Sequence, residues 1–247
     1  MQLHLKTWQF VEDYLKTKTG IIIPIGSTEQ HGPTGLIGTD ALTAEMIGRG
    51  VGEKIGALVA PTISVGMAQH HMAFAGSMTL RPSTLIAVIQ DNVMSLVRHG
   101  FTRFFFINGH GGNIATVTAA FSEIYADRSL EKMTNQPSIK CKLRNWWEGS
   151  AVTKLRQELY PVGEGSHATA SEVALTWYKY PETIQRKEME PRIAPNGSFA
   201  DAEDYRRAFP DGRIGSDPNL ATPEQGKRIY ELAVDEVARD YERWVAN

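Results

Sequence analysis

The sequence predicts one α/β domain in which helices cover both faces of a mostly parallel sheet. Short apolar runs alternate along the chain with longer segments whose apolar residues recur at helical spacing. Buried strands that alternate with helices of this length are typical of parallel sheets. The chain has 247 residues, of which 42% are hydrophobic and 22% are charged, so it can enclose one large core. We therefore expect a single domain over residues 1–247.

The strands are expected where the apolar runs are short and are followed by polar turns. The first run is Ile-Ile-Ile-Pro-Ile and the third is Arg-Phe-Phe-Phe-Ile, and both indicate strands that are buried on both faces. The four predicted strands cover residues 21–25, 57–63, 103–107 and 139–143.

Helices are expected between these strands and after the last one. The segments with helical spacing are 39–54, 83–98, 114–127 and 171–180. Gly100 lies two residues beyond the second of them, where a helix stop is expected. Residues 192–220 are rich in Pro, Gly, Asn and Asp and predict a long ordered loop. The following Thr-Pro-Glu-Gln at 222–225 has the pattern of a capping box, which predicts a helix to about Trp244.

The overall charge and the cysteine content narrow the function classes. The formal net charge is -2 and both signs are mixed along the chain, so nothing indicates binding to nucleic acid or to an anionic membrane. Cys141 is the only cysteine, which excludes an internal disulfide and a cysteine-based zinc cluster and is consistent with a reducing cytoplasm. It lies within a predicted strand, where a buried structural thiol is expected. We find no signal-peptide pattern, no apolar run long enough to span a membrane and no G-x-S-x-G motif.

The first predicted strand leads into the loop GSTEQHGPTGLIGTD at residues 26–40. Glu29 and His31 are two residues apart, so in an extended segment both side chains project to one side. They follow the carboxyl end of a strand, which is where open α/β sheets bind ligands. Asp40 begins the next helix, and the intervening glycines permit tight turns that bring it back over the same place. The alternative role for Asp40 is that of a helix N-cap.

A second polar turn, NGHGGN at residues 108–113, follows the third predicted strand. Parallel strands end at the same edge of a sheet, so we expect His110 to lie near the side chains of the first loop. Two imidazoles and two carboxylates suit Zn²⁺, Mn²⁺ or Fe²⁺. A turn or core role for His110 stays open. The turn could also cradle a phosphate at a helix N-terminus, although it matches neither G-x-G-x-x-G nor G-x-x-x-x-G-K-[ST].

A third polar stretch, GEGSHATASE at residues 163–172, opens another predicted helix. His167 stands in the loop and Glu172 in the first helical turn, so both could face the same edge of the sheet. Alternatively, Glu172 complements the helix dipole and His167 is solvated. Glu164 is expected to be solvated. The residues that could either line a pocket or pack in the core are His70, His71, Trp146 and Trp147.

The motifs GSTEQHGP…GTD, NGHGGN and GSHATASE resemble those of the creatininase (creatinine amidohydrolase) family. The resemblance runs along nearly the whole chain, from Thr7 to the final helix. It implies a creatininase-like, three-layer α/β/α fold, a dinuclear metal site and hydrolysis of cyclic or linear amide bonds, often by a homohexamer. Two divalent ions are expected, with Zn²⁺ as the first choice and Mn²⁺ or Fe²⁺ as alternatives.

The same resemblance assigns roles by motif position. Glu29, Asp40 and His110 correspond to the ligands of one ion. His31 and a bridging Asp40 correspond to ligands of the second ion. The ions would activate the water that attacks the amide carbonyl. His167 corresponds to the family's catalytic histidine, which would pass a proton to the departing nitrogen.

Three positions depart from the family pattern. Thr34 stands where a second histidine is common, and Gly163 stands where creatininases carry a tryptophan. Gly112 stands where true creatininases supply a glutamate to the second ion, and glycine cannot ligate. Because His31 and Asp40 alone fall short of the three protein ligands usual in catalytic zinc sites, we expect Glu172 to be a ligand and a member of the catalytic site. The alternative is that Glu172 stays outside the coordination sphere and water fills the gap.

These departures favour another small polar amide over creatinine as the substrate. The predicted function is metal-dependent hydrolysis of a carbon–nitrogen bond other than a peptide bond, in a linear amide, cyclic amide or formamide. The enzyme is expected to be a cytoplasmic homo-oligomer that binds a small-molecule amide and neither nucleic acid nor membrane. The alternatives are a peptidase for a short modified peptide and a catalytically idle metal-binding scaffold.

Overall fold

A computed structural model describes residues 1–130 and 137–246 of the chain. Within these residues, four parallel strands form one sheet in the order β2-β1-β3-β4. Their bounds are β1 Gly20–Ile25, β2 Leu58–Val59, β3 Arg103–Asn108 and β4 Lys140–Asn145. The last residues of β1, β3 and β4 are in register. The loops that follow these three strands therefore leave the sheet side by side at one edge.

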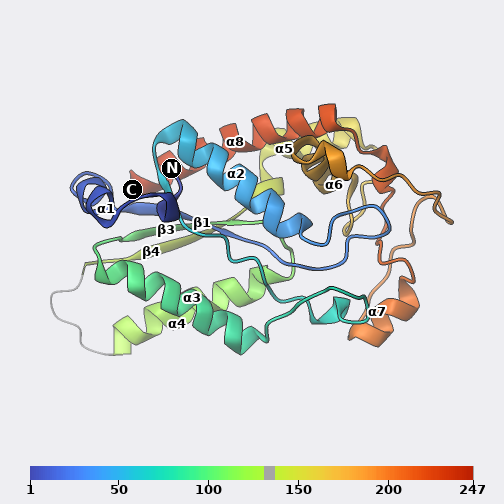
Figure 1. The fold of residues 1–247 in the computed structure, drawn as a ribbon. Helices are drawn as coiled ribbons and strands as arrows, with labels where there is room; N and C mark the ends of the chain where they lie inside the picture. The colour runs from blue at the N-terminus through green and yellow to red at the C-terminus, as the bar shows by residue number, and fades with distance from the viewer. Residues whose placement is uncertain (131–136, 247) are drawn as a thin grey trace.

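Helices cover both faces of this sheet (Figure 1). One layer contains α2 (Thr39–Ile55), α5 (Ser150–Leu159), α6 (Ala170–Lys179) and α8 (Pro223–Val245). The other layer contains α3 (Pro82–Arg98) and α4 (Asn113–Leu130), while α1 (Trp8–Leu15) and α7 (Ala202–Ala208) lie at opposite ends of the molecule. Single 3₁₀ turns occur at Leu3–Leu5, Gln69–His71, Trp146–Glu148, Pro181–Thr183 and Pro218–Leu220. The predicted three-layer α/β/α fold is confirmed.

The two large core clusters lie one on each face of the sheet. Ile22 and Phe105 pack with residues of α2, α5 and α8. Their strand neighbours Ile21, Phe104 and Phe106 pack with residues of α3 and α4 on the other face. Successive side chains of a strand point to opposite faces, so a continuous apolar run is what a doubly covered strand requires.

The second strand is much shorter than the predicted 57–63. Regular pairing ends at Val59, and Pro61 lacks the N–H that a ladder hydrogen bond needs. Ile63 still forms an isolated bridge with Ile25. The chain therefore stays beside β1 up to its carboxyl end without being a strand.

The prediction of a loop throughout residues 192–220 is wrong at α7. The side chain of Asp201 caps this helix by accepting a hydrogen bond from the N–H of Asp204 at 2.9 Å. Tyr205 and Phe209, one turn apart, are buried at this end of the molecule. Two apolar residues in a polar stretch are too weak a periodic signal to predict a helix.

The final helix begins as predicted but lacks the full capping box. The Thr222 hydroxyl accepts a hydrogen bond from the N–H of Gln225 at 3.2 Å. The side chain of Gln225 instead accepts a hydrogen bond from the Tyr160 hydroxyl at 3.0 Å. Gln225 thus ties α8 to the end of α5.

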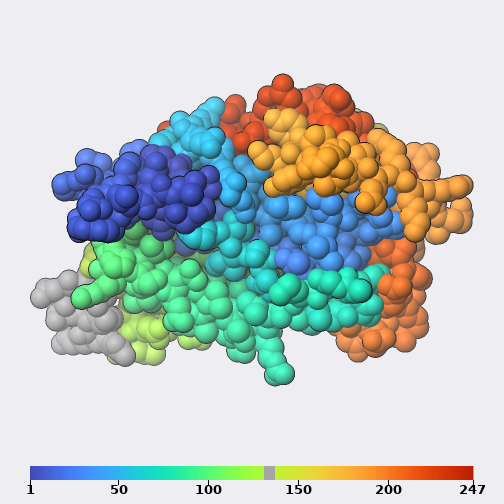
Figure 2. All heavy atoms as spheres, viewed as in Figure 1, coloured from blue at the N-terminus to red at the C-terminus, as the bar shows by residue number. Residues whose placement is uncertain are grey.

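The two chain termini lie together at the end of the molecule opposite α7 (Figure 1). At the α7 end, segments from distant parts of the chain, coloured blue, teal and orange, meet at the surface (Figure 2). No helix among the residues described is both long and apolar enough to cross a membrane.

Candidate metal centre

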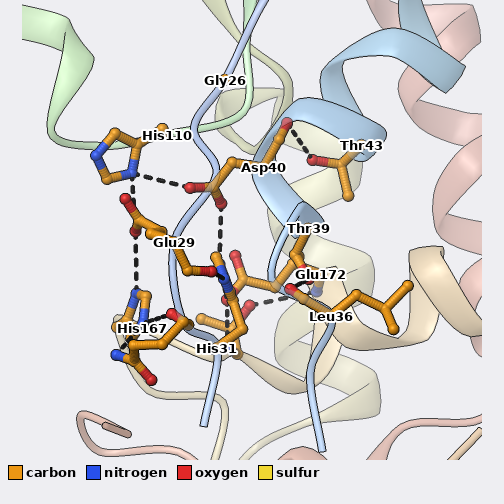
Figure 3. A network of polar contacts seen from close by, with 12 residues as sticks. Gly26, Glu29, His31, Leu36, Thr39, Asp40, Thr43, His110, His167 and Glu172 are labelled. Atoms are coloured by element: carbon orange, nitrogen blue, oxygen red, sulfur yellow. Dashed lines mark hydrogen bonds and ion pairs between the residues drawn. The ribbon is translucent and has the colours of Figure 1, made fainter. Parts of the chain in front are cut away.

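Six chemically active side chains predicted from the sequence meet at the carboxyl edge of the sheet (Figure 3). They come from the loop after β1, the first turn of α2, the turn after β3, and the loop and first turn that open α6. The six residues are Glu29, His31, Asp40, His110, His167 and Glu172.

Two glycines let the strand ends press against the start of α2. A side chain on Gly109 would collide with the carbonyl oxygen of Asp40, and one on Gly26 would collide with the backbone between Asp40 and Ala41. Both positions therefore require the absence of a Cβ atom. This close approach places Asp40 beside the turn that carries His110.

The two asparagines of NGHGGN hold this turn in place. The side-chain amide of Asn108 donates to the carbonyl of His110 at 2.7 Å and to the Asn145 side chain at 2.8 Å. Asn113 donates to the carbonyl of Gly26 at 2.9 Å and accepts from the N–H of Met67 at 3.0 Å. The turn is thereby tied to β4, to the end of β1 and to the loop after β2.

Backbone carbonyls orient the two imidazoles nearest Asp40. The Nε2 atom of His110 lies 2.9 Å from the carbonyl oxygen of Met67, so it donates, and Nδ1 faces inward. The Nδ1 atom of His31 donates in the same way to the carbonyl of Glu29 at 3.0 Å, and Nε2 faces inward. Metal-binding histidines are held by such outer hydrogen bonds, which leave the other nitrogen for the ion.

The inward nitrogens lie next to carboxylate oxygens. His110 Nδ1 is 3.0 Å from Asp40 Oδ2 and 3.3 Å from Glu29 Oε1. His31 Nε2 is 3.0 Å from Asp40 Oδ1 and 3.8 Å from Glu172 Oε1. The donor atoms form three overlapping sets whose members lie within 4.8 Å of one another: Glu29, Asp40 and His110; His31, Asp40 and Glu172; Glu29, His31 and His167.

The carboxylates are buried in a way that suits a cation. Glu29 is 0% exposed and Asp40 is 2% exposed. Among the described residues, imidazole nitrogens approach Oε1 of Glu29 and Oδ2 of Asp40, but no group forms a well-aligned hydrogen bond to these atoms or to Oε2 of Glu29. Burying an unpartnered carboxylate is costly, and buried charges in proteins are paired or bind metals. The residues present therefore fit a divalent metal ion.

The carboxylates of the cluster govern how its imidazoles titrate. Burial alone would lower the pKa of His31, but the charges of Asp40 and Glu172 outweigh it and raise that pKa to about 10. His110 behaves likewise, with Glu29 and Asp40 raising its pKa to about 9 against the effect of burial. Burial raises the pKa of Glu172 to about 7. Protons on the imidazoles thus supply the positive charge that the buried carboxylates need.

His167 differs from the other two imidazoles. Its Nε2 atom lies 2.8 Å from the carbonyl oxygen of Gln30, and its Nδ1 atom lies 3.8 Å from Glu29 Oε1. Burial, together with the nearby His31 and His71, holds the pKa of His167 well below its usual value. The ring is therefore neutral at pH 7.

Glu172 has a structural contact as well as a place in a donor set. It forms a capping box with Thr169, in which Glu172 Oε1 accepts from the Thr169 N–H at 2.5 Å. Glu164 is not solvated as predicted, because its carboxylate lies 2.7 Å from Arg156 Nη2 and accepts hydrogen bonds from Ser171. Sequence reasoning missed Arg156, which stands on the unpredicted helix α5.

Two further residues near the cluster, His71 and Gln30, were only weakly indicated or not indicated at all by the sequence. His71 is buried, and its Nε2 atom lies 3.1 Å from Glu29 Oε1. Gln30 contacts both His71 and His167 through its amide group. Its position between Glu29 and His31 in the first motif is the signal that could have identified it.

A cavity of about 490 Å³ opens onto the cluster. Its polar wall includes Asp40, His110, His167 and Glu172, and its apolar wall includes Trp147 and Phe199. The volume is typical of small-molecule sites. Trp146 and Trp147 both line the cavity; Trp147 is only partly buried, whereas Trp146 is buried and also packs in the core.

Known proteins share this sequence pattern and fold. The family model for creatininase, described as creatinine amidohydrolase, matches residues 4–241. The mycofactocin precursor peptide peptidase of Mycobacterium ulcerans is 28% identical over 246 residues, which cover 92% of this chain and 86% of that protein. The creatinine amidohydrolase of Pseudomonas putida is 27% identical over 230 residues, which cover 88% of this chain and 86% of that protein. A structure of the Mn form of creatininase, 24% identical, has a TM-score of 0.81 and shares the fold over 100% of this chain and 99% of that one.

Proposed function

The chain belongs to the creatininase family of metal-dependent amidohydrolases, and we propose that it hydrolyses a small polar amide at a centre of two divalent ions. The observation that carries this proposal is that two of its donor sets share Asp40. Asp40 Oδ1 lies 3.0 Å from His31 and Oδ2 lies 3.0 Å from His110, so each oxygen belongs to a different set. We take residues 1–247 as one catalytic domain.

We assign one donor set to each ion. Glu29, Asp40 and His110 would hold the first, and His31, Asp40 and Glu172 the second. Imidazole and carboxylate ligands favour Zn²⁺, with Mn²⁺ or Fe²⁺ as alternatives, and the likeness to a Mn form of creatininase supports a divalent ion. When bound, the two ions would acidify a water molecule and polarise the amide carbonyl.

His167 would move the proton that amide cleavage requires. Its Nε2 proton is held by the carbonyl of Gln30, so the resting ring presents Nδ1 without a proton. We infer that Nδ1 first accepts a proton from the attacking water and then releases it to the departing nitrogen. General acid–base transfer of this kind contributes roughly 10²- to 10⁴-fold to a rate.

The cavity favours a neutral substrate. Arg156 lines it, but its guanidinium group is paired with Glu164 and bonded to Ser171. Its positive charge is therefore already balanced by Glu164 before a substrate binds. The departures from creatininase at Gly112 and Gly163 support an amide other than creatinine. We also propose a cytoplasmic homohexamer, which rests on the family resemblance and, for the compartment, on the single cysteine.

A second candidate is a peptidase for a short modified peptide, and the similarity to the M. ulcerans peptide peptidase favours it. The deciding experiment strips the purified protein with a chelator, restores Zn²⁺ or Mn²⁺, and measures turnover of creatinine, formamides, cyclic amides and short peptides. We expect turnover of small amides that is lost with the metal, restored with it, and absent from His110→Ala.

The other outcomes are informative. Turnover confined to peptides would select the peptidase. Turnover that survives complete metal removal would refute the metal centre. Tight metal uptake without turnover of any amide would indicate a metal-binding scaffold.

A further inference from the structure

Gln30 stands between two proposed ligands and contacts two stacked histidines. Its main-chain oxygen is 2.8 Å from His167 Nε2, and its side-chain nitrogen is 3.0 Å from His71 Nδ1. The two imidazole rings stack with their centroids 4.4 Å apart. Neither His71 nor the side chain of Gln30 has a role in the reaction as described so far.

The orientation of the Gln30 amide is determined by its surroundings. Its oxygen accepts a hydrogen bond from the N–H of Gly32 at 2.8 Å, and its nitrogen donates to the carbonyl of Gly212 at 2.9 Å. If the oxygen and the nitrogen were exchanged, the amide NH₂ would face the N–H of Gly32, donor against donor. The amide oxygen would face the carbonyl of Gly212, acceptor against acceptor. A side chain on Gly212 would collide with this amide, so the loop after α7 holds it closely.

Hydrogen-bond accounting then assigns the protons of both histidines. A carbonyl only accepts and an amide nitrogen only donates. His167 Nε2 therefore carries a proton for the Gln30 carbonyl, while His71 Nδ1 accepts one of the two Gln30 amide protons. The other amide proton goes to Gly212. Gln30 Nε2 also lies 3.0 Å from His167 Nε2, but donation there would require a third amide proton and would leave the Gln30 carbonyl facing a lone pair.

We propose that Gln30 is a positioning residue that sets opposite tautomers in His71 and His167. Both inward nitrogens approach the same oxygen, Glu29 Oε1. His71 Nε2, which carries a proton, lies 3.1 Å from it, and His167 Nδ1, which carries a lone pair, lies 3.8 Å from it. His71 thus places its protonated nitrogen beside Glu29 and cannot ligate a metal through it, whereas the Nδ1 atom of His167 keeps a lone pair. The consequence for catalysis rests on the proposed role of Glu29 as a ligand.

Nitrogen-15 solid-state NMR of metal-free, histidine-labelled protein tests the tautomers directly. The His71 signals are assigned as those that are absent from the spectrum of His71→Gln. We expect a protonated Nε2 and an unprotonated Nδ1 for His71, and Gln30→Glu should move the proton to Nδ1 because a carboxylate only accepts. Gln225→Glu, the same exchange at the start of α8, should leave the tautomer unchanged. A wild-type His71 protonated at Nδ1, or one unaffected by Gln30→Glu, would overturn the proposal.

A second measurement tests whether His71 acts through its N–H donor or only through packing, and it does not depend on the Gln30→Glu variant. In His71→Gln the amide keeps a donor close to the position of Nε2, whereas in His71→Phe the ring keeps the stacking and loses the donor. Titration of metal-free protein with Zn²⁺ should show about 10- to 100-fold weaker binding by His71→Phe and binding within about threefold of wild type by His71→Gln, as for other residues that support metal ligands.

The opposite order, with His71→Phe binding as tightly as wild type and His71→Gln more weakly, would show that His71 only packs and would overturn the proposal. A wild-type protein that takes up no Zn²⁺ would instead refute the proposed metal centre. The NMR spectra of metal-free protein would still decide the tautomers in that case.

Discussion

Glu172 Oε1 lies 3.8 Å from His31 Nε2, so the first turn of α6 meets the loop after β1 at the candidate metal centre. The contact supplies a carboxylate to the side of Asp40 that faces His31. The turn after β3 offers none there, because its residue 112 is glycine.

Glu172→Gln should remove the second ion while preserving the start of α6. A glutamine oxygen can still accept from the Thr169 N–H and complete the capping box, but the amide is a much poorer ligand than a carboxylate. We expect metal analysis to fall from two ions per chain to one, with the melting temperature of the metal-free protein nearly unchanged. Glu164→Gln, beside the same helix end, should retain two ions. Two ions in Glu172→Gln would place Glu172 outside the coordination sphere.

His167→Ala should lose turnover and keep both ions. The residue is outside the two donor sets that share Asp40, and its neutral ring faces the cavity. Loss of a general acid–base group predicts a kcat about 10²- to 10⁴-fold lower. Steady-state kinetics and metal analysis of the same preparation check both points. If one ion disappears with the imidazole, the set of Glu29, His31 and His167 is the occupied one.

Gly112→Glu should not convert the site into that of a creatininase. A Cβ atom at position 112 would collide with His110 Nε2 and would lie 2.8 Å from the carbonyl of Met67. The substitution therefore displaces the imidazole and breaks its bond to Met67, for which we expect about 10- to 100-fold weaker metal binding. Gly111→Glu is the matched control, since nothing lies within 4 Å of its added Cβ atom. Creatinine hydrolysis gained by Gly112→Glu would contradict this account.

Cys141 should react slowly with thiol reagents in the folded protein. Burial raises the pKa of its thiol to about 12, so deprotonation at pH 8 is suppressed and begins only as the pH approaches that value. Relative to an ordinary thiol with a pKa near 8.5, the reactive thiolate is scarcer by about three powers of ten. Iodoacetamide labelling followed by mass spectrometry should be correspondingly slower in native than in unfolded protein, and labelling should leave the pH 8 activity intact. Cys141 is partly buried in β4, so the expectation of a fully buried thiol is wrong. Equal rates in both states would refute the effect of this partial burial.

Much of the fold could be predicted because the central strands are covered on both faces. Ile22 and Phe105 contact one helical layer while Ile21 and Phe104 contact the other, which requires the continuous apolar runs seen in the sequence. The extent of β2 could not be predicted, because its apolar run continues past Val59 while pairing does not.

The convergence of the candidate ligands could be predicted because each follows a strand or opens a helix at one sheet edge. The environment of Glu164 could not, because its partner Arg156 lies on a helix without a clear signal. The position of His71 depends on a single 3₁₀ turn in the loop after β2. That turn is anchored by long-range contacts such as the 2.8 Å bond from the Ala68 N–H to Thr79, which have no sequence periodicity.

The central claim is that one shared aspartate joins two ion sites, and anomalous diffraction from crystals of the Zn²⁺-loaded protein tests it most directly. We expect two zinc peaks, both bonded to Asp40. The first should also be bonded to Glu29 and His110, and the second to His31 and Glu172, with zinc–carboxylate distances of about 2.0 to 2.2 Å. A single peak, or two peaks that do not share Asp40, would contradict the account.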